Sequence, residues 1–286
     1  MKKIISAFLM LAGFCPQAQT YKPAVKLQAG KKYTIVTTAK GNMSQELMGQ
    51  SMDIPVEMNA TSLLEVKNVK DKSYDLSSTT SHLVLSMTMM GQSMNYDSDK
   101  KEDQEGQLGQ MMGGGINKPA SFSINSFGKI IAGSIKKSES PEKEAPGGGM
   151  MMGMMKMSGE DEISPAINLF ASDAEMKLGD SFTDSSSTAN GKDKRSTTYT
   201  LSEITDGAIK FTINGISAVT SETEMQGMQT VSNTSTKSTG EMWISTATGL
   251  LVKKVLNMTI TGTIEVAGMS IPMNGTNVVT ITVEGQ

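Results

Sequence analysis

The sequence predicts a mainly β protein built as one long, strongly curved antiparallel sheet, a half-open barrel with one or two short helices. Three observations lead to this prediction. Apolar and polar side chains alternate strictly over unusual lengths, turn-forming residues separate the alternating runs, and helix signals are few. The chain has 286 residues, a length that suits a single β domain.

The longest alternating run extends from Leu250 to Val266. Its even positions are apolar except for Lys254 and Gly262, and its odd positions are mostly polar. A second run extends from Ile54 to Lys67 with the same pattern. At about 3.3 Å per residue, each unbroken strand would approach or exceed roughly 50 Å, whereas strands are usually ~17–20 Å long. Strands of that length must curve.

A change of parity marks a third long run. The apolar positions shift from Tyr74 and Leu76 to Leu83 and Leu85, which predicts a bulge or a sharp bend between them. Shorter alternating runs and the turns between strands complete the sheet. The shorter runs cover 33–39, 199–204, 209–213 and 279–283, and the clearest turns are at 70–73, 206–207 and 247–249.

Two segments carry helix signals. Ser164 followed by Pro165 has the pattern of a helix start, and it predicts a short helix from Ser164 to Ala174. A second short helix is predicted from Glu102 to Met112. Residues 136–160 are rich in glycine and methionine and lack periodicity, so we expect a mobile insertion within the single domain 19–286.

The first 18 residues resemble a secretory signal. Lys2 and Lys3 precede an apolar stretch, and small residues follow it up to Ala18. The apolar stretch is shorter than the roughly 20 residues that a membrane-spanning helix needs. Because Phe14 precedes Cys15, where lipoprotein processing requires a small side chain, we expect cleavage after Ala18 without lipidation. The protein is therefore predicted to be exported, to the periplasm or the cell surface.

Charge and composition exclude several function classes. Without Lys2 and Lys3, the 26 basic residues become 24 against 29 acidic ones, a net charge of −5, and Arg195 is the only arginine. Such a chain is a poor match for nucleic acid. After signal removal no cysteine remains, which excludes disulfides and thiolate metal sites. With His82 as the only histidine, no Ser-His-Asp arrangement is recognisable, and we predict neither enzymatic activity nor a cofactor.

Two clusters in the sequence contain potential metal ligands. The acidic run between Asp97 and Glu105 offers oxygen ligands for Ca²⁺, but its spacing does not fit the known loop, and a solvated strand end is the simpler interpretation. Methionine is abundant, with 25 in the chain, and thioethers suit Cu(I) or Ag(I). Flexible apolar filler is the competing interpretation of the densest methionine cluster. That cluster consists of Met150, Met151, Met152, Met154, Met155 and Met157.

Three local patterns resemble a family. They are Ser126-Phe127-Gly128-Lys129-Ile130, Leu178-Gly179-Asp180-Ser181-Phe182 and the segment from Gly240 to Leu250, which contains Trp243 and Gly249. In this order they resemble a broad family of secreted Gram-negative proteins of unknown function. The last pattern is also similar to periplasmic lipoprotein carriers. That resemblance implies a curved, half-open sheet around an apolar groove partly plugged by helices, and it implies no site residues.

The predicted helices are too short to cover the apolar face of the sheet. A helix from Ser164 to Ala174 spans about 16 Å, against strands of roughly 50 Å. We therefore expect either closure of the sheet or an open groove for an apolar ligand, such as an acyl chain or lipid. The rival hypotheses are a soft-metal binding protein and a structural envelope protein. The candidate groove residues are Val56, Met58, Leu64, Leu256, Met258, Ile260 and Ile264.

Overall fold

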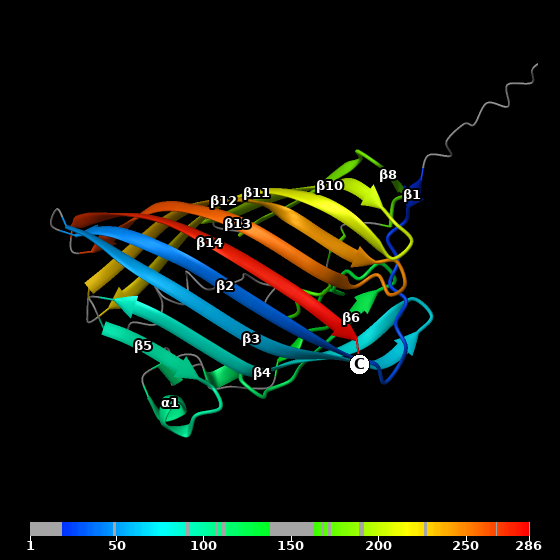
Figure 1. Ribbon diagram of the computed structural model, residues 1–286, viewed down its shortest axis with the longest axis horizontal. Helices are drawn as coiled ribbons and strands as arrows, with labels where there is room; N and C mark the ends of the chain where they lie inside the picture. The colour runs from blue at the N-terminus through cyan, green and yellow to red at the C-terminus, as the bar shows by residue number, and fades with distance from the viewer. Residues whose placement is uncertain are drawn as a thin grey trace, which may run out of the picture.

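One antiparallel sheet dominates the computed structural model (Figure 1). The structure describes residues 19–47, 50–89, 92–106, 108–109, 113–137, 163–167, 169–170, 173–188, 192–225, 228–266 and 268–285. The sheet contains β2 (Lys32–Leu47), β3 (Gln50–Lys70), β4 (Ser73–Met89), β5 (Gln92–Asp97), β6 (Ala120–Asn125), β7 (Lys136–Lys137), β9 (Ser181–Ser187), β10 (Asp193–Ile204), β11 (Ala208–Met225), β12 (Met228–Ser245), β13 (Leu251–Val266) and β14 (Met269–Gly285). The predicted mainly β, antiparallel fold is confirmed.

The strand order brings the two ends of the chain together in the middle of the sheet. The order is β7-β6-β4-β3-β2-β14-β13-β12-β11-β10-β9, and β5 pairs with the tip half of β4. The C-terminal strand β14 thus lies between β2 and β13. Among the described strands, β7 and β9 at the two ends of this order do not pair, so the sheet is not closed into a barrel. A separate two-stranded sheet joins β1 (Thr20–Tyr21) to β8 (Met176–Lys177).

The parity change in the third long run is a β-bulge. On β4, His82 pairs with Thr61 and Thr80 pairs with Ser62, so Ser81 has no partner of its own. The extra residue returns Leu83 to the face on which Leu76 lies, and both side chains are buried. The predicted bend is therefore confirmed at Ser81.

Glycines allow the strongest curvature. At Gly240 of β12 an added Cβ would collide with the carbonyl oxygen of Val255 on β13. At Gly262 of β13 it would collide with the carbonyl oxygen of Asn233 on β12. Only a residue without a side chain tolerates so close an approach of neighbouring backbones. The two glycines thus bend the sheet where these strands meet.

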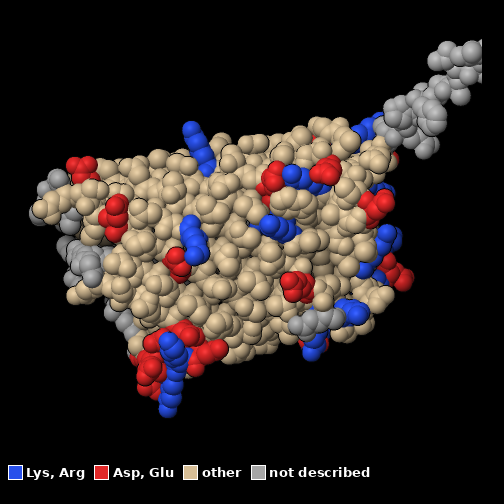
Figure 2. Space-filling view, viewed as in Figure 1, with Lys and Arg blue, Asp and Glu red and all other residues tan. Residues whose placement is uncertain are grey.

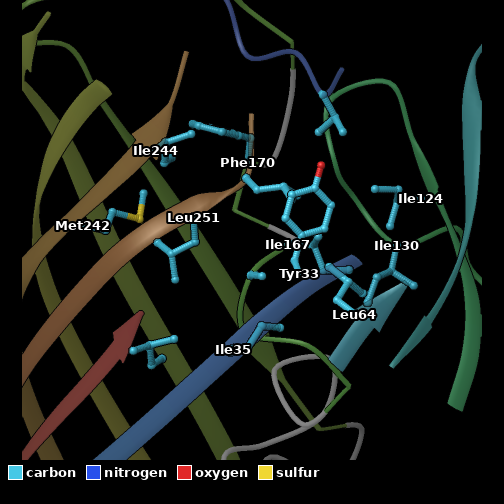
Figure 3. Packing of buried hydrophobic residues seen from close by; sticks show 14 of the residues in the cluster. Tyr33, Ile35, Leu64, Ile124, Ile130, Ile167, Phe170, Met242, Ile244 and Leu251 are labelled. Carbon is cyan, nitrogen blue, oxygen red and sulfur yellow. The ribbon is translucent and has the colours of Figure 1, made fainter. Parts of the chain in front are cut away.

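The main hydrophobic core lies at one end of the sheet, which we name the closed end (Figure 3). It joins strands from both sides of the curve, because Leu64 and Ile124 belong to the same buried cluster as Phe211 and Met242. Phe211 is fully buried and packs edge-on against Phe170 and Phe182, with ring centroids 5.7 and 6.1 Å away. The sheet therefore wraps around a shared core at this end.

The N-terminal segment 22–28 holds the closed end together. The amide of Val25 donates to the Ser126 carbonyl at 2.7 Å, and the amide of Lys26 donates to the Thr248 carbonyl at 2.9 Å. The Tyr74 hydroxyl donates to the carbonyl of Val25 at 2.6 Å. One extended segment is thus tied to loops that lie far apart in the sequence.

The three sequence patterns that suggested a family all lie at this end. Each contains a glycine with positive φ: Gly128 at 88°, Gly179 at 89° and Gly249 at 74°. The predicted turn at 247–249 is confirmed with Gly249 in the left-handed region, and an added Cβ there would collide with the carbonyl oxygen of Ala24 in the N-terminal segment. The turns at Gly128 and Gly249 therefore lie against that segment.

The helix predictions are partly wrong. Helical residues occupy part of the predicted 102–112 helix: α1 (Lys101–Glu105) ends before Gly106, and residues 108–109 are helical again. The short 3₁₀ turn Gly113–Gly115 follows. The described part of Ser164–Ala174 contains turns rather than a helix. Its Ala166 carbonyl accepts a hydrogen bond from the Leu251 amide at 3.1 Å, a tertiary bond that competes with a helical partner four residues later.

The predicted insertion 136–160 begins inside the sheet, because β7 pairs with β6. The rest of it, the six methionines Met150, Met151, Met152, Met154, Met155 and Met157, and the signal segment 1–18 lie outside the described residues. Their mobility, metal binding and export function stay predictions.

Candidate functional site

The candidate site is the middle of the concave inner face of the sheet. We define the inner face as the one that carries the closed-end core. Directly paired residues on neighbouring strands share a face, so the pairing register assigns the inner positions along each strand. Figure 2 shows charged side chains scattered over the opposite, outer face.

Buried clusters occupy both ends of the inner face. The closed-end cluster has been described. A second cluster at the far hairpin ends, the tip cluster, contains Met43, Ile54, Met87, Ile264 and Met273, all buried. These side chains come from five neighbouring strands, β2, β3, β4, β13 and β14.

Between the two clusters the inner positions of β3 and β13 are only partly buried, and we name this part the middle band. At the same level on β4, Leu83 and Leu85 are buried in a third cluster with Tyr96 of β5, and Met58 packs against it. On β13 Leu251 and Ile264 are buried, while Leu256, Met258 and Ile260 between them are partly exposed. The sheet continues through this region with unbroken pairing to β12 and β14. Apolar side chains in the middle band are therefore accessible although their backbone is fully paired.

Strand β3 shows the same profile. Ile54 and Leu64 are buried, and Val56 and Met58 between them are partly exposed. Val56 pairs with Gly41 of β2, Gly41 with Asn277 of β14, and Asn277 with Met258 of β13, and all four residues are partly buried. The middle band thus extends along this row across β3, β2, β14 and β13, whereas Val279 in the next row belongs to the closed-end core.

The structure divides the predicted groove residues into two groups. Val56, Met58, Leu256, Met258 and Ile260 lie on the middle band, half-buried. Leu64 is packed in the closed-end core and Ile264 in the tip cluster, with exposed fractions of 0% and 1%. Sequence alternation places all seven on one face correctly, but it contains no information on where along the strand packing stops.

The middle band has two chemically different walls. The inner positions Leu256, Met258 and Ile260 of β13 are apolar, whereas hydroxyl side chains occupy the inner positions of the adjacent strand β12 from Thr230 to Ser238. They are Thr230, Ser232, Thr234, Thr236 and Ser238. The inner positions Ser217 and Ser221 of β11 continue this wall. The apolar wall suits a hydrocarbon, and the hydroxyl wall offers hydrogen bonds to water or to polar groups.

Three buried polar atoms on inner strand positions have no hydrogen-bond partner within the described residues. They are the side-chain oxygen Oδ1 of Asn277 on β14, the hydroxyl of Thr230 on β12 and the hydroxyl of Tyr96 on β5, which pairs with Leu85. Asn277 pairs directly with Met258 and with Gly41, so it lies in the middle band. A buried acceptor without a partner costs free energy, and a polar group of a bound molecule or a water would satisfy it.

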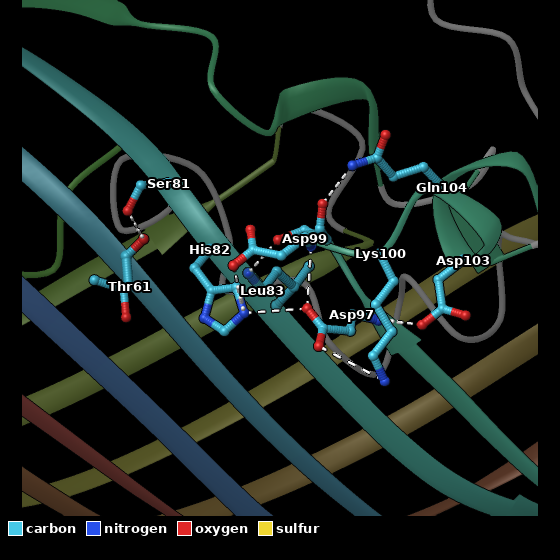
Figure 4. Close-up of polar contacts among 10 residues, drawn as sticks. Thr61, Ser81, His82, Leu83, Asp97, Asp99, Lys100, Asp103 and Gln104 are labelled. Carbon is cyan, nitrogen blue, oxygen red and sulfur yellow. Dashed lines mark hydrogen bonds and ion pairs between the residues drawn. The ribbon is translucent and has the colours of Figure 1, made fainter.

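The structure adds one cluster on the outer face that sequence reasoning missed (Figure 4). His82 Nε2 lies 3.2 Å from Asp97 Oδ1 and 3.5 Å from Asp99 Oδ2. The backbone N–H of Asp99 donates to Asp97, which holds the pKa of Asp97 below its usual value, and His82 adds to this effect. Fifteen positions separate His82 from Asp97, and only the pairing of β4 with β5 brings them together.

These three side chains are the one group of potential metal ligands found within the described residues. They are already engaged with one another, and Lys100 Nζ lies 3.9 Å from Asp97 Oδ2. The arrangement therefore behaves as a solvated ion-pair network beside α1, as the sequence indicated for the acidic run. Within the described residues, the ring of His82 forms its hydrogen bond and ion pairs with carboxylates.

Comparison with known proteins gives a family. The model of the family of unknown function DUF6263 matches residues 71–251, which is more than half of the chain, and the chain belongs to this family. The match includes the three glycine patterns of the closed end. No curated protein matches the chain.

Comparison with solved structures gives matches at low identity. Lipovitellin, from a structure of its lipid–protein interactions, is 11% identical with a TM-score of 0.45. The aligned region covers 91% of this chain and 26% of lipovitellin. An outer membrane channel from Pseudomonas putida F1 is 6% identical with a TM-score of 0.23, covering 91% and 98% of the two chains. The β domain of the Bordetella autotransporter BrkA is 7% identical, with a TM-score of 0.23 and coverages of 89% and 99%.

The chain spans about a quarter of the length of lipovitellin. All three TM-scores lie below 0.5, so these likenesses carry no argument about function. Separately, the helices in the described part of the chain include none that is long and apolar enough to cross a membrane.

Proposed function

We propose that this member of the DUF6263 family is a non-enzymatic, exported protein that binds an apolar ligand, an acyl chain or lipid, on the middle band. One observation carries the proposal. On the inner faces of β3 and β13, Val56, Met58, Leu256, Met258 and Ile260 stay partly exposed at the margins of three buried clusters.

The energetic argument follows from the exposed apolar area. Each Å² of apolar surface removed from water contributes about 25 cal/mol, so an acyl chain lying along these side chains gains most where they are concave and pre-arranged. Methionine is unbranched and flexible. Met58 and Met258 would therefore adapt to acyl chains of different shapes.

The absence of enzymatic activity is supported by the surroundings of His82. Its ring nitrogen Nε2 contacts Asp97 and Asp99 on the outer face, away from the middle band. A hydrolytic triad requires a hydroxyl nucleophile at hydrogen-bond distance from the histidine, and the described residues provide none there. Export rests on the pattern of residues 1–18.

A fluorescent fatty acid whose emission depends on its environment tests the proposal. It should bind the folded chain and be displaced by phospholipid. Ile260→Glu introduces a charge on the middle band and should weaken binding at least tenfold, whereas Thr259→Glu, on the adjacent exposed outer position, should bind as the wild type does.

Circular dichroism of both variants checks that they fold. If correctly folded wild-type protein takes up no acyl probe, the proposal fails and the structural envelope role moves ahead. Binding that is equally weakened by both substitutions would also contradict it, because the two positions face opposite sides of the sheet.

A further inference from the structure

One lysine lies on the inner face. Lys254 of β13 pairs directly with Met242 of β12 and with Ile281 of β14, and both partners are fully buried inner-face residues. Its neighbour Lys253 pairs with Trp243, and its Nζ lies 5.7 Å from the centroid of the Trp243 ring on the outer face. The two lysines therefore point to opposite sides of the sheet.

In the part of the chain that is described, no hydrogen bond or ion pair joins the Lys254 ammonium to another side chain, and the residue is half-buried. Lysine can bury its methylene stem and keep its ammonium in water. The next inner positions of β13 are those of Leu256 and Met258.

This charge is isolated within the concave surface. Across the described inner positions of β2, β3, β4 and β11 to β14, Lys254 is the only charged residue. The other inward charges, Asp184, Asp193 and Arg195, lie on the edge strands β9 and β10. A lone cation at one end of an apolar surface complements a molecule with one anionic end and one hydrocarbon tail.

We propose that Lys254 binds the anionic head group of a single-chain amphiphile whose tail lies along Leu256, Met258 and Ile260. This inference rests on the proposed function and specifies its ligand class. A charge-assisted hydrogen bond from the ammonium to a carboxylate or phosphate oxygen is stronger than a neutral one, and it fixes the direction in which the tail enters the middle band.

The dimensions agree with one acyl chain. From Lys254 to Ile260 the strand advances six residues, roughly 20 Å at about 3.3 Å per residue. One acyl chain spans about half of the ~30 Å hydrocarbon core of a bilayer. The tail therefore fits between Lys254 and the buried Ile264 without entering the tip cluster.

Competition against an uncharged dye tests the assignment. Nile red bound to the full chain is displaced by oleate, by 1-oleoyl lysophosphatidic acid, or by oleyl alcohol, which has the same tail and no charge. In the wild type, at least one anion should displace the dye at about tenfold lower concentration than the alcohol. The preferred anion distinguishes a carboxylate head from a phosphate head.

Lys254→Met removes the charge and keeps an unbranched side chain, and Lys253→Met is the matched control on the outer face. We expect Lys254→Met to lose the preference for the anion while binding oleyl alcohol as before, which also shows that the variant is folded. Lys253→Met should keep the preference.

Equal displacement by the anions and the alcohol in the wild type would overturn the inference and leave apolar binding intact. So would a preference that survives in Lys254→Met or disappears in Lys253→Met. Failure of Nile red and of all three amphiphiles to bind would refute the proposed function itself.

Discussion

The closed end and the middle band belong to the same face of the same strands, and they differ in what covers that face. At the closed end the N-terminal segment 22–28 and the turns around Ala166 and Phe170 pack onto the sheet, and the core side chains lose nearly all exposure. In the middle band the same strands pair without interruption, yet Met258 and its neighbours stay half-exposed. Backbone pairing therefore extends the sheet beyond the region that the core fills.

The closed end contributes mainly to the stability of the fold, whereas the side chains of the middle band are accessible to a ligand. Burial at the closed end raises the pKa of Tyr21 to about 12, as expected for a phenol removed from water. The middle-band residues, by contrast, stay partly exposed. Substitutions at the closed end should therefore change the free energy of unfolding, and substitutions in the middle band should change ligand binding.

The largest effect is expected for Phe211→Ala. Phe211 is fully buried among aromatic rings, and removal of such a side chain costs about 3–5 kcal/mol of unfolding free energy. Met258→Ala, on the same face in the half-buried middle band, should cost about 1 kcal/mol, below the usual range for a buried methionine. Urea titration of both variants measures the difference. Equal losses would mean that the middle band is packed like a core.

The next effect concerns the N-terminal segment. Gly249→Ala combines a positive φ of 74° with a collision against the Ala24 carbonyl oxygen, so we expect a loss of more than ~2 kcal/mol. Gly30→Ala is the control, because its φ is 81° and no atom lies within 4 Å of the added Cβ; it should lose about 1 kcal/mol. Thermal melts with limited proteolysis near residue 22 compare them. Similar losses would show that segment 22–28 does not depend on close contact with this turn.

A bulky side chain placed in the middle band tests the comparison through ligand affinity. Met258→Trp should fill part of the middle band and reduce acyl-probe affinity about tenfold, with a stability change below ~1.5 kcal/mol because the position has room. Asn257→Trp, at the exposed outer position beside it, serves as the control and should leave affinity unchanged. A strong loss of stability in Met258→Trp with unchanged binding would contradict the assignment of the two regions.

The smallest effect is expected at the outer-face cluster. The Asp99 amide, with help from His82, lowers the pKa of Asp97, so the ionised carboxylate stabilises the fold above the ordinary pKa of aspartate, about 3.9, and this contribution disappears as the pH falls through the lowered value. Asp97→Asn should thus be slightly less stable than the wild type at pH 7 and equal to it at pH 2. A stability difference that grows as the pH falls would have the wrong sign.

Local patterns were sufficient to predict much of the sheet. Alternation identified the long strands, the parity change located the bulge at Ser81, and the Thr248-Gly249 pair predicted a left-handed turn. The prediction of a helix beginning at Ser164 was wrong. The apolar residues of this segment are nevertheless buried: Ile163, Ala166, Ile167 and Phe170. Their burial comes from tertiary contacts of a turn, which local periodicity cannot distinguish from a helix.

The site was less predictable because it depends on pairing between distant strands. Alternation placed Leu64 and Met58 on one face, but their different exposure depends on segments 22–28 and 163–170, which pack only at the closed end. The inward direction of Lys254 was visible in the sequence as a break in an apolar row. Its isolation becomes evident only when the register with β12 and β14 is known.

The central claim, that the middle band is open to an acyl ligand while the closed end is packed, can be tested with single thiols. Cys15 is the only cysteine of the chain, so a variant with Cys15→Ser accepts one cysteine at a time. Met258→Cys reports on the middle band, Leu64→Cys on the closed end and Thr259→Cys on the outer face. The rate of reaction with a maleimide is measured with and without oleate.

We predict that Met258→Cys reacts readily and is protected by oleate, that Thr259→Cys reacts at the same rate in both conditions, and that Leu64→Cys reacts slowly throughout. If Met258→Cys in folded protein reacts as slowly as Leu64→Cys, or reacts readily and is not protected by the ligand, the account is contradicted.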